Sequence, residues 1–154
     1  MLYAVLKLVH LLSLIAWIGG MFFTLACLRP ALGVLDAPAR PRLMGAVFAR
    51  FFAIVNAAIG LLLLSGLAML WLAWRAAAGF RLPLSWAVMI ALGLAMMGLF
   101  GYVRGALLKR LQAAVQAQDA PAAAATLARV RTLVSVNLAL GVLVIGAMKL
   151  GAAA

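Results

Sequence analysis

The sequence predicts an all-α membrane protein, a polytopic four-helix bundle that forms a single transmembrane domain over residues 1–154. Apolar residues make up 69% of the chain and charged residues 10%, whereas soluble domains are about 45–50% apolar. A membrane-spanning helix needs about 20 predominantly apolar residues. Four such runs are present, at 8–28, 51–74, 82–103 and 132–148.

The basic residues lie singly or in pairs at the ends of these apolar runs and do not form one basic face. This placement argues against nucleic acid as a partner and favours the lipid bilayer. Segments 29–50 and 104–131 together contain nine Lys and Arg residues, against two in 75–81. By the positive-inside rule the first and third loops are cytoplasmic, which places both termini outside.

The first helix is expected at about 2–28. It should end at Arg29-Pro30, because proline disfavours the helical conformation for the residue before it. A turn at Asp36-Ala37-Pro38 then leads to the second helix, expected at 46–76. Cys27 is the one cysteine and permits no internal disulfide, and we expect its side chain to be buried.

The third helix is expected at 84–118, after a turn bracketed by Gly79 and Pro83. Its second half alternates apolar and polar residues with the period of an amphipathic helix, so we expect it to extend into the cytoplasm. Asp119-Ala120-Pro121 should break it, and the fourth helix is expected at 122–150. Six glycines of these two helices predict close helix packing or room for a flat ligand; they are Gly93, Gly98, Gly101, Gly105, Gly141 and Gly146.

One face of the first helix collects its polar residues. At about 100° per residue, the side chains within about 60° of His10 are those of Tyr3, Lys7, Ser13, Trp17, Met21 and Thr24. Ionisable groups at membrane depth are costly and usually face the bundle interior, so we interpret this face as a candidate functional site. The alternative is that a neutral His10 only bridges two helices through hydrogen bonds.

The residue types narrow the chemistry. Neither carboxylate, Asp36 or Asp119, lies in a span, and no nucleophile, base and orienting acid occur together. Hydrolysis is therefore disfavoured, and the chain is more readily a non-enzyme; if it is an enzyme, we expect an oxidoreductase. An imidazole with thioether and aromatic neighbours suits Cu(I) or haem iron. Helical polar residues that can hydrogen-bond between helices are Asn56, Ser65, Ser135 and Asn137.

Depth from the outer face groups His10 with three methionines. By the predicted topology, Met69, Met89 and Met148 lie in the same outer layer, so they are candidate metal ligands beside His10, although methionine is also a common core filler. Trp17 is a candidate cofactor contact. Basic residues near the outer boundary, which can pair with haem propionates or simply reach the lipid surface, are Lys7, Arg75 and Arg81.

Three patterns in the sequence resemble copper-resistance D (CopD)-like membrane proteins. GYVRGALLKRL (101–111) and RVRTLVSVNLALGVLVI (129–145) are similar to the third-helix exit and the last helix of that family. The pattern L-K-x-x-H-x₆-W-x-G-G-x-x-F of their first helix is matched here by Leu6, Lys7, His10, Trp17, Gly19, Gly20 and Phe23. The histidine, the tryptophan and the second glycine also resemble the membrane protoporphyrinogen oxidases that bind haem b.

The resemblance implies a bacterial inner-membrane protein with His10 as a ligand candidate, both termini being periplasmic by the topology above. Its function would be copper uptake or tolerance beside a periplasmic copper-binding partner. A haem b redox protein or oxidase with His10 on the iron stays open, although SWAVMIALG (85–93) lacks the lysine that the oxidases carry there. A structural or assembly subunit is the third interpretation, and the sequence is compatible with a homodimer.

Overall fold

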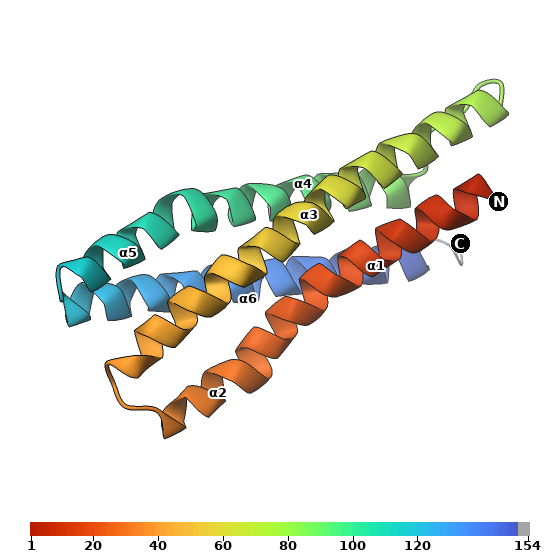
Figure 1. Cartoon of the computed structure of the whole chain (residues 1–154). Helices are drawn as coiled ribbons and strands as arrows, with labels where there is room; N and C mark the ends of the chain where they lie inside the picture. Colours follow the sequence, from red (N-terminus) through yellow and green to blue (C-terminus); the bar gives the residue numbers. More distant parts are fainter. Residues whose placement is uncertain (151–154) are drawn as a thin grey trace.

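The computed structural model describes residues 1–150, and this range contains helices and no strand. Four long helical segments follow one another, and each runs antiparallel to the one before it (Figure 1). All four are long and apolar enough to cross a membrane, which confirms the all-α polytopic bundle. Their bounds are Leu2–Val34, Ala39–Ala76, Leu84–Gln116 and Ala120–Leu150.

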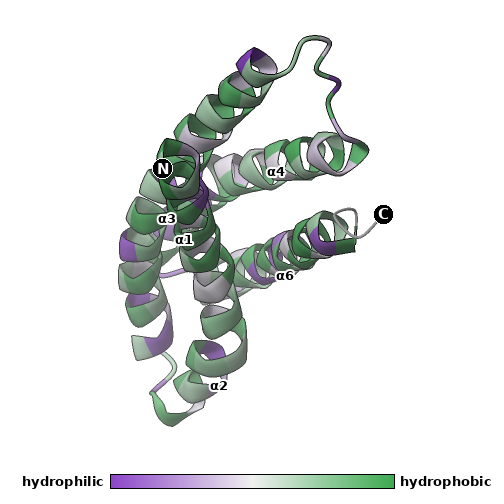
Figure 2. Cartoon of the chain, turned by 90° about the vertical axis from the view of Figure 1, so that its right-hand side faces the viewer, coloured by the Kyte–Doolittle hydropathy of each residue, from purple (hydrophilic) through white to green (hydrophobic). Residues whose placement is uncertain are grey.

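Most apolar side chains point away from the bundle. In the most apolar stretch of each segment, only 11% to 22% of the residues are buried within the chain. Leu64 on the second segment, Leu94 on the third and Leu143 on the fourth are more than half exposed, and the hydrophobic colour continues around the helices (Figure 2). A surface of this kind is stable in lipid and not in water, so the chain is a multi-pass membrane protein.

The first segment continues past the expected end at Arg29-Pro30, so that prediction was wrong. The N–H of Arg29 donates to the carbonyl of Thr24, five residues back. This wider π-turn relieves the clash between the Pro30 ring and the carbonyl four residues earlier, and Pro30 then lies in the first turn of a new helix, where its missing N–H is tolerated. The segment consists of α1 (Leu2–Phe23), the π-helix η1 (Thr24–Leu28), α2 (Arg29–Ala31) and the 3₁₀-helix η2 (Leu32–Val34).

The second segment is one helix, α3 (Ala39–Ala76), which begins earlier than the expected residue 46. The predicted turn at Asp36-Ala37-Pro38 is present, and the carbonyl of Asp36 accepts the N–H groups of Ala39 and Arg40 at 3.0 and 3.4 Å. These bonds start the helix directly after the turn. Cys27 on η1 is exposed and not buried as expected.

The third segment begins at Leu84 as predicted, after a turn in which Gly79 adopts φ +78°. It extends beyond the apolar run, as expected, and consists of α4 (Leu84–Tyr102), the π-helix η3 (Val103–Leu107) and α5 (Leu108–Gln116). The fourth segment, α6 (Ala120–Leu150), begins two residues before the expected position. Asp119 caps it, because its carboxylate accepts the N–H of Ala122 at 2.9 Å.

Aromatic rings fill the middle of the bundle. Trp17 on α1 is 2% exposed and meets the ring of Phe100 on α4 edge-on, with 6.1 Å between the centroids. Phe100 in turn meets Phe52 on α3 at 5.4 Å. These contacts join three of the four segments, and their ring pairs have the geometry that aromatic quadrupoles favour.

Close packing through glycine occurs at one of the six predicted positions. A Cβ at Gly141 on α6 would lie 2.8 Å from Cδ1 of Ile18 and 3.3 Å from Cε of Met96, so α1, α4 and α6 meet at this level. At the other five a Cβ would meet open space, so these glycines make no close helix contact in the described chain, and the alternative of room for a ligand stays a prediction. Gly20, outside that set, does serve packing, because a Cβ there would overlap the ring of Phe51.

Candidate functional site

The polar face of α1 points into the bundle over most of its length. Ser13, Trp17, Met21 and Thr24 are buried, His10 is half-buried, and Tyr3 and Lys7 are exposed. The hydroxyls of Ser13 and Thr24 each donate to the carbonyl four residues earlier in the same helix, both at 2.8 Å. Both hydroxyls are therefore hydrogen-bonded within their own helix. His10 is the residue of this face that hydrogen-bonds across to α3.

His10 contacts α3 at Ser65 and Gly66. Its Nδ1 lies 3.0 Å from Oγ of Ser65, a side chain that is 2% exposed. A Cβ on Gly66 would lie 3.4 Å from Cε1 of His10, so the imidazole edge rests against the backbone of α3. The sequence predicts that Ser65 can hydrogen-bond between helices, but it does not indicate His10 as the partner.

The hydrogen bonds around Ser65 favour one tautomer of the imidazole. The hydroxyl of Ser65 donates to the carbonyl of Leu61, so its oxygen is free to accept a hydrogen bond from the N–H at Nδ1 of His10. A neutral imidazole that donates from Nδ1 keeps its lone pair on Nε2. Nε2 is therefore the atom of this site that can bind a metal.

Counted along their helices, Met89 and Met148 lie about as far as His10 from one level at which three helices pack together. Gly141 marks the level at which Ile18 of α1 and Met96 of α4 meet α6. Towards the end that holds the N-terminus, His10 lies eight residues from Ile18, Met89 seven from Met96 and Met148 seven from Gly141. At about 1.5 Å per residue these offsets are about 10–12 Å.

Met69 lies one turn beyond Ser65 on the same face of α3. It is half-buried, as are Met89 and Met148. Within residues 1–150 no group of three or more His, Cys, Asp or Glu side chains is placed to hold a metal ion. A metal bound at His10 would therefore need thioethers, and ligation by these three methionines stays a prediction.

The other candidate cofactor residues have separate surroundings. Trp17 is packed in the aromatic core, and Lys7 is exposed near the start of α1. Arg75 is exposed at the end of α3, where its guanidinium carbon lies 4.9 Å from the ring centroid of Trp71, a cation–π contact. Arg81 is exposed in the turn before α4. In this structure the three basic residues reach towards solvent or the bilayer surface.

Asn137 on α6 is a buried polar residue beside the core. It is 5% exposed, and its Nδ2 donates to the sulfur of Met21 at 3.6 Å, so it links α6 to α1. Its Oδ1 is buried without a hydrogen-bond partner. A cavity of about 20 Å³ adjoins Asn137, Met21 and Trp17, which is enough room for one water molecule.

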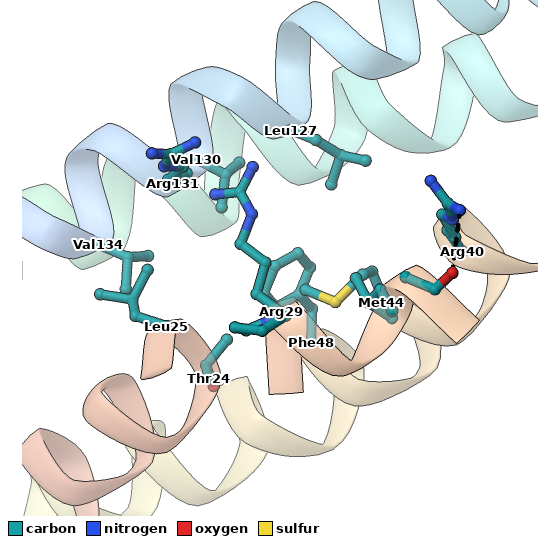
Figure 3. Close-up of a pocket in the computed structure, with 13 residues that line it drawn as sticks. Thr24, Leu25, Arg29, Arg40, Met44, Phe48, Leu127, Val130, Arg131 and Val134 are labelled. Carbon is teal, nitrogen blue, oxygen red and sulfur yellow. Dashed lines mark hydrogen bonds between the residues drawn. The ribbon is translucent and has the colours of Figure 1, made fainter. Parts of the chain in front are cut away.

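A large cavity at the opposite end of the bundle, shown in Figure 3, was not predicted from the sequence. Its volume is about 380 Å³, and three arginines line it: Arg29, Arg40 and Arg131. From the sequence, these arginines were interpreted only as indicators of membrane topology. Nothing in their spacing indicates that they converge, because they come from three different helical segments.

Comparison with known families gives one match. The model of CopD, described as copper resistance protein D, matches residues 45–150, which is more than half of the chain. The match includes 101–111 and 129–145 but begins after the first helical segment, so His10 lies outside it. No curated protein and no solved structure matches the chain.

Proposed function

The chain belongs to the copper resistance protein D family, and we propose that it handles copper by binding Cu(I) inside the membrane. In this proposal Nε2 of His10 is the principal ligand, and thioethers of Met69, Met89 or Met148 complete the site. Cu(I) is a soft ion that prefers such imidazole and thioether ligands. The proposal places the site in the outer half of a bacterial inner membrane, with both termini periplasmic and a periplasmic copper-binding protein as the partner.

The observation that carries the proposal is the hydrogen-bond chain from His10 through Ser65 to the carbonyl of Leu61. Histidines that bind metals almost always donate their second ring N–H to an oxygen, which fixes the tautomer and the orientation of the ring. Ser65 performs this role for His10, and the imidazole is held in the form that binds a metal through Nε2.

The same hydrogen bond also fits the alternative that His10 only bridges α1 and α3. The two interpretations differ in what Nε2 does. A structural bridge needs Nδ1 alone, whereas a copper site needs both ring nitrogens. Measurement of copper binding, and not of stability, therefore separates them.

The test is an anaerobic Cu(I) titration of the purified full chain in detergent against a chromophoric chelator. We expect His10→Ala to lose Cu(I) binding and Ser65→Ala to bind about 10–100-fold more weakly, the usual cost of losing a residue that orients a ligand. Ser13→Ala is the matched control. Its hydroxyl is also buried but bonds only to Val9 of its own helix, so its affinity should equal that of the parent.

Two outcomes would contradict the proposal. Unchanged Cu(I) affinity in His10→Ala, in a protein that still inserts and purifies as a folded species, would reduce His10 to a helix bridge. A Soret band in the visible spectrum of the parent protein, lost in His10→Ala, would show that His10 binds a b-type haem and not copper.

A further inference from the structure

The arginine-lined cavity lies at the end of the bundle where the first segment turns into α3 and α6 begins (Figures 1 and 3). His10 lies towards the other end, beside the N-terminus. The cavity volume of about 380 Å³ falls in the range of about 300–1,000 Å³ that small-molecule sites occupy. It is therefore large enough to hold a ligand and separate from the proposed copper site.

The charge of the cavity is positive and uncompensated. The chain has two carboxylate side chains, Asp36 and Asp119, and neither lines the cavity. Arg29 reaches from the end of the first segment towards Arg131 on α6 (Figure 3), and their like charges repel each other. An anion between the two guanidinium groups would convert this repulsion into attraction.

Arg40 is held in place at the other side of the cavity. Its Nε donates to the carbonyl of Leu35 at 2.9 Å and its terminal nitrogen lies 3.4 Å from the carbonyl of Gly33. Gly33 lies in η2 and Leu35 directly after it, so both carbonyls belong to the chain reversal that leads to α3, and they orient the guanidinium before any ligand arrives. A preorganised side chain loses little conformational freedom on binding.

Apart from Thr24, whose hydroxyl donates to the carbonyl of Gly20, the other side chains that line the cavity are apolar. Met44 and Phe48 of α3 and Val130 of α6 are buried, and the partly buried Leu25, Leu127 and Val134 continue this wall. The lining therefore combines a charged group of three arginines with a hydrocarbon surface at the end of membrane-spanning helices. A ligand that matches both parts is an anion joined to an apolar chain.

We propose that this cavity binds an anionic phospholipid, with Arg29 and Arg131 on the phosphate oxygens, Arg40 beside the head group and the acyl chain along the apolar wall. The planar guanidinium donates pairs of hydrogen bonds that fit phosphate oxygens. Basic pockets between membrane helices on the cytoplasmic side bind anionic head groups in this way. The bound lipid joins the first segment to α6 through its phosphate.

The experiment is native mass spectrometry of the full chain in detergent, after mixing with equimolar phosphatidylglycerol and phosphatidylcholine. We expect the parent to retain phosphatidylglycerol in preference. Arg29→Gln and Arg131→Gln should each weaken its retention roughly tenfold, which corresponds to about 1.4 kcal/mol. The matched control is Arg129→Gln, which removes the same charge from an exposed position on the same helix and does not line the cavity.

A second arm distinguishes lipid from free phosphate. Excess inorganic phosphate should not displace phosphatidylglycerol, because it lacks the acyl chain that contacts the apolar wall. Displacement by inorganic phosphate would overturn the lipid assignment. Equal retention of the two lipids by the parent would overturn the proposal, and so would an equal loss in Arg129→Gln, since that result would reflect net charge and not this cavity.

Discussion

The two ends of the bundle differ in the charge of the side chains that they bring together. At the end with the N-terminus, the imidazole of His10 and the buried hydroxyl of Ser65 are joined by a hydrogen bond. At the other end, Arg29, Arg40 and Arg131 bring three positive charges to one cavity that no carboxylate lines. A neutral site of soft donors suits a monovalent cation, and a positive site suits an anion. The arginines that the sequence presents as topology signals therefore also converge on one cavity.

The largest expected effect tests which end faces the cytoplasm. Nine basic residues in 29–50 and 104–131 against two in 75–81 predict that the arginine cavity is cytoplasmic and the His10 end periplasmic. Alkaline phosphatase fused after the last residue should be active, and a fluorescent reporter that folds only in the cytoplasm should be dark there. The reverse pattern would exchange the compartments of the two ends and remove periplasmic copper delivery from the proposal.

The next effect concerns Trp17, which lies between the two ends. Trp17→Ala should lower the free energy of unfolding by about 3–5 kcal/mol, the usual cost of deleting a buried large aromatic side chain. The measurement is thermal or denaturant unfolding in detergent. Trp74→Ala is the control, because Trp74 is 65% exposed and should change stability by about 0.5 kcal/mol or less. A Trp17→Ala protein with unchanged stability but altered copper binding would instead move Trp17 into the site.

The smallest effect sharpens the His10 end. Met89→Leu keeps the side-chain volume and removes the sulfur, so we expect Cu(I) affinity to fall by up to about tenfold, or about 1.4 kcal/mol, while phosphatidylglycerol retention stays the same. Met97→Leu is the control, since Met97 lies on the same helix, two turns further from the His10 end, and also packs against the core. Identical Cu(I) titrations for the two variants and the parent would show that Met89 only packs in the core and is not a copper ligand.

The spans and most turns could be predicted from the sequence because apolar length, proline and glycine act locally. Leu84 begins α4 as expected, and the turn at Asp36-Ala37-Pro38 is present. The end of the first segment could not be predicted in this way. Whether Pro30 ends a helix depends on whether the preceding turn widens, and a π-turn has no composition of its own that distinguishes it from an α-turn.

The candidate site was predictable only as far as one helix face determines it. Helical periodicity placed Ser13, Trp17, Met21 and Thr24 together, and all four are buried. The pairing of His10 with Ser65 spans 55 positions, and it depends on the register of α1 against α3. The arginine cavity depends on three segments at once. Pairings of this kind are fixed by packing between helices, which local pattern does not encode.

The π-turn η1 lets the first segment change its length at one point without changing its direction. A π-turn holds one residue more than an α-turn, so deletion of one residue within Thr24–Leu28 would restore regular pairing with almost no net rotation of the residues after it. Arg29 would keep nearly the same face and move by only about 1.5 Å along the helix axis, while His10 and Trp17, which precede the turn, would keep their partners. The two ends of the first helix therefore stay in phase whether or not this extra residue is present.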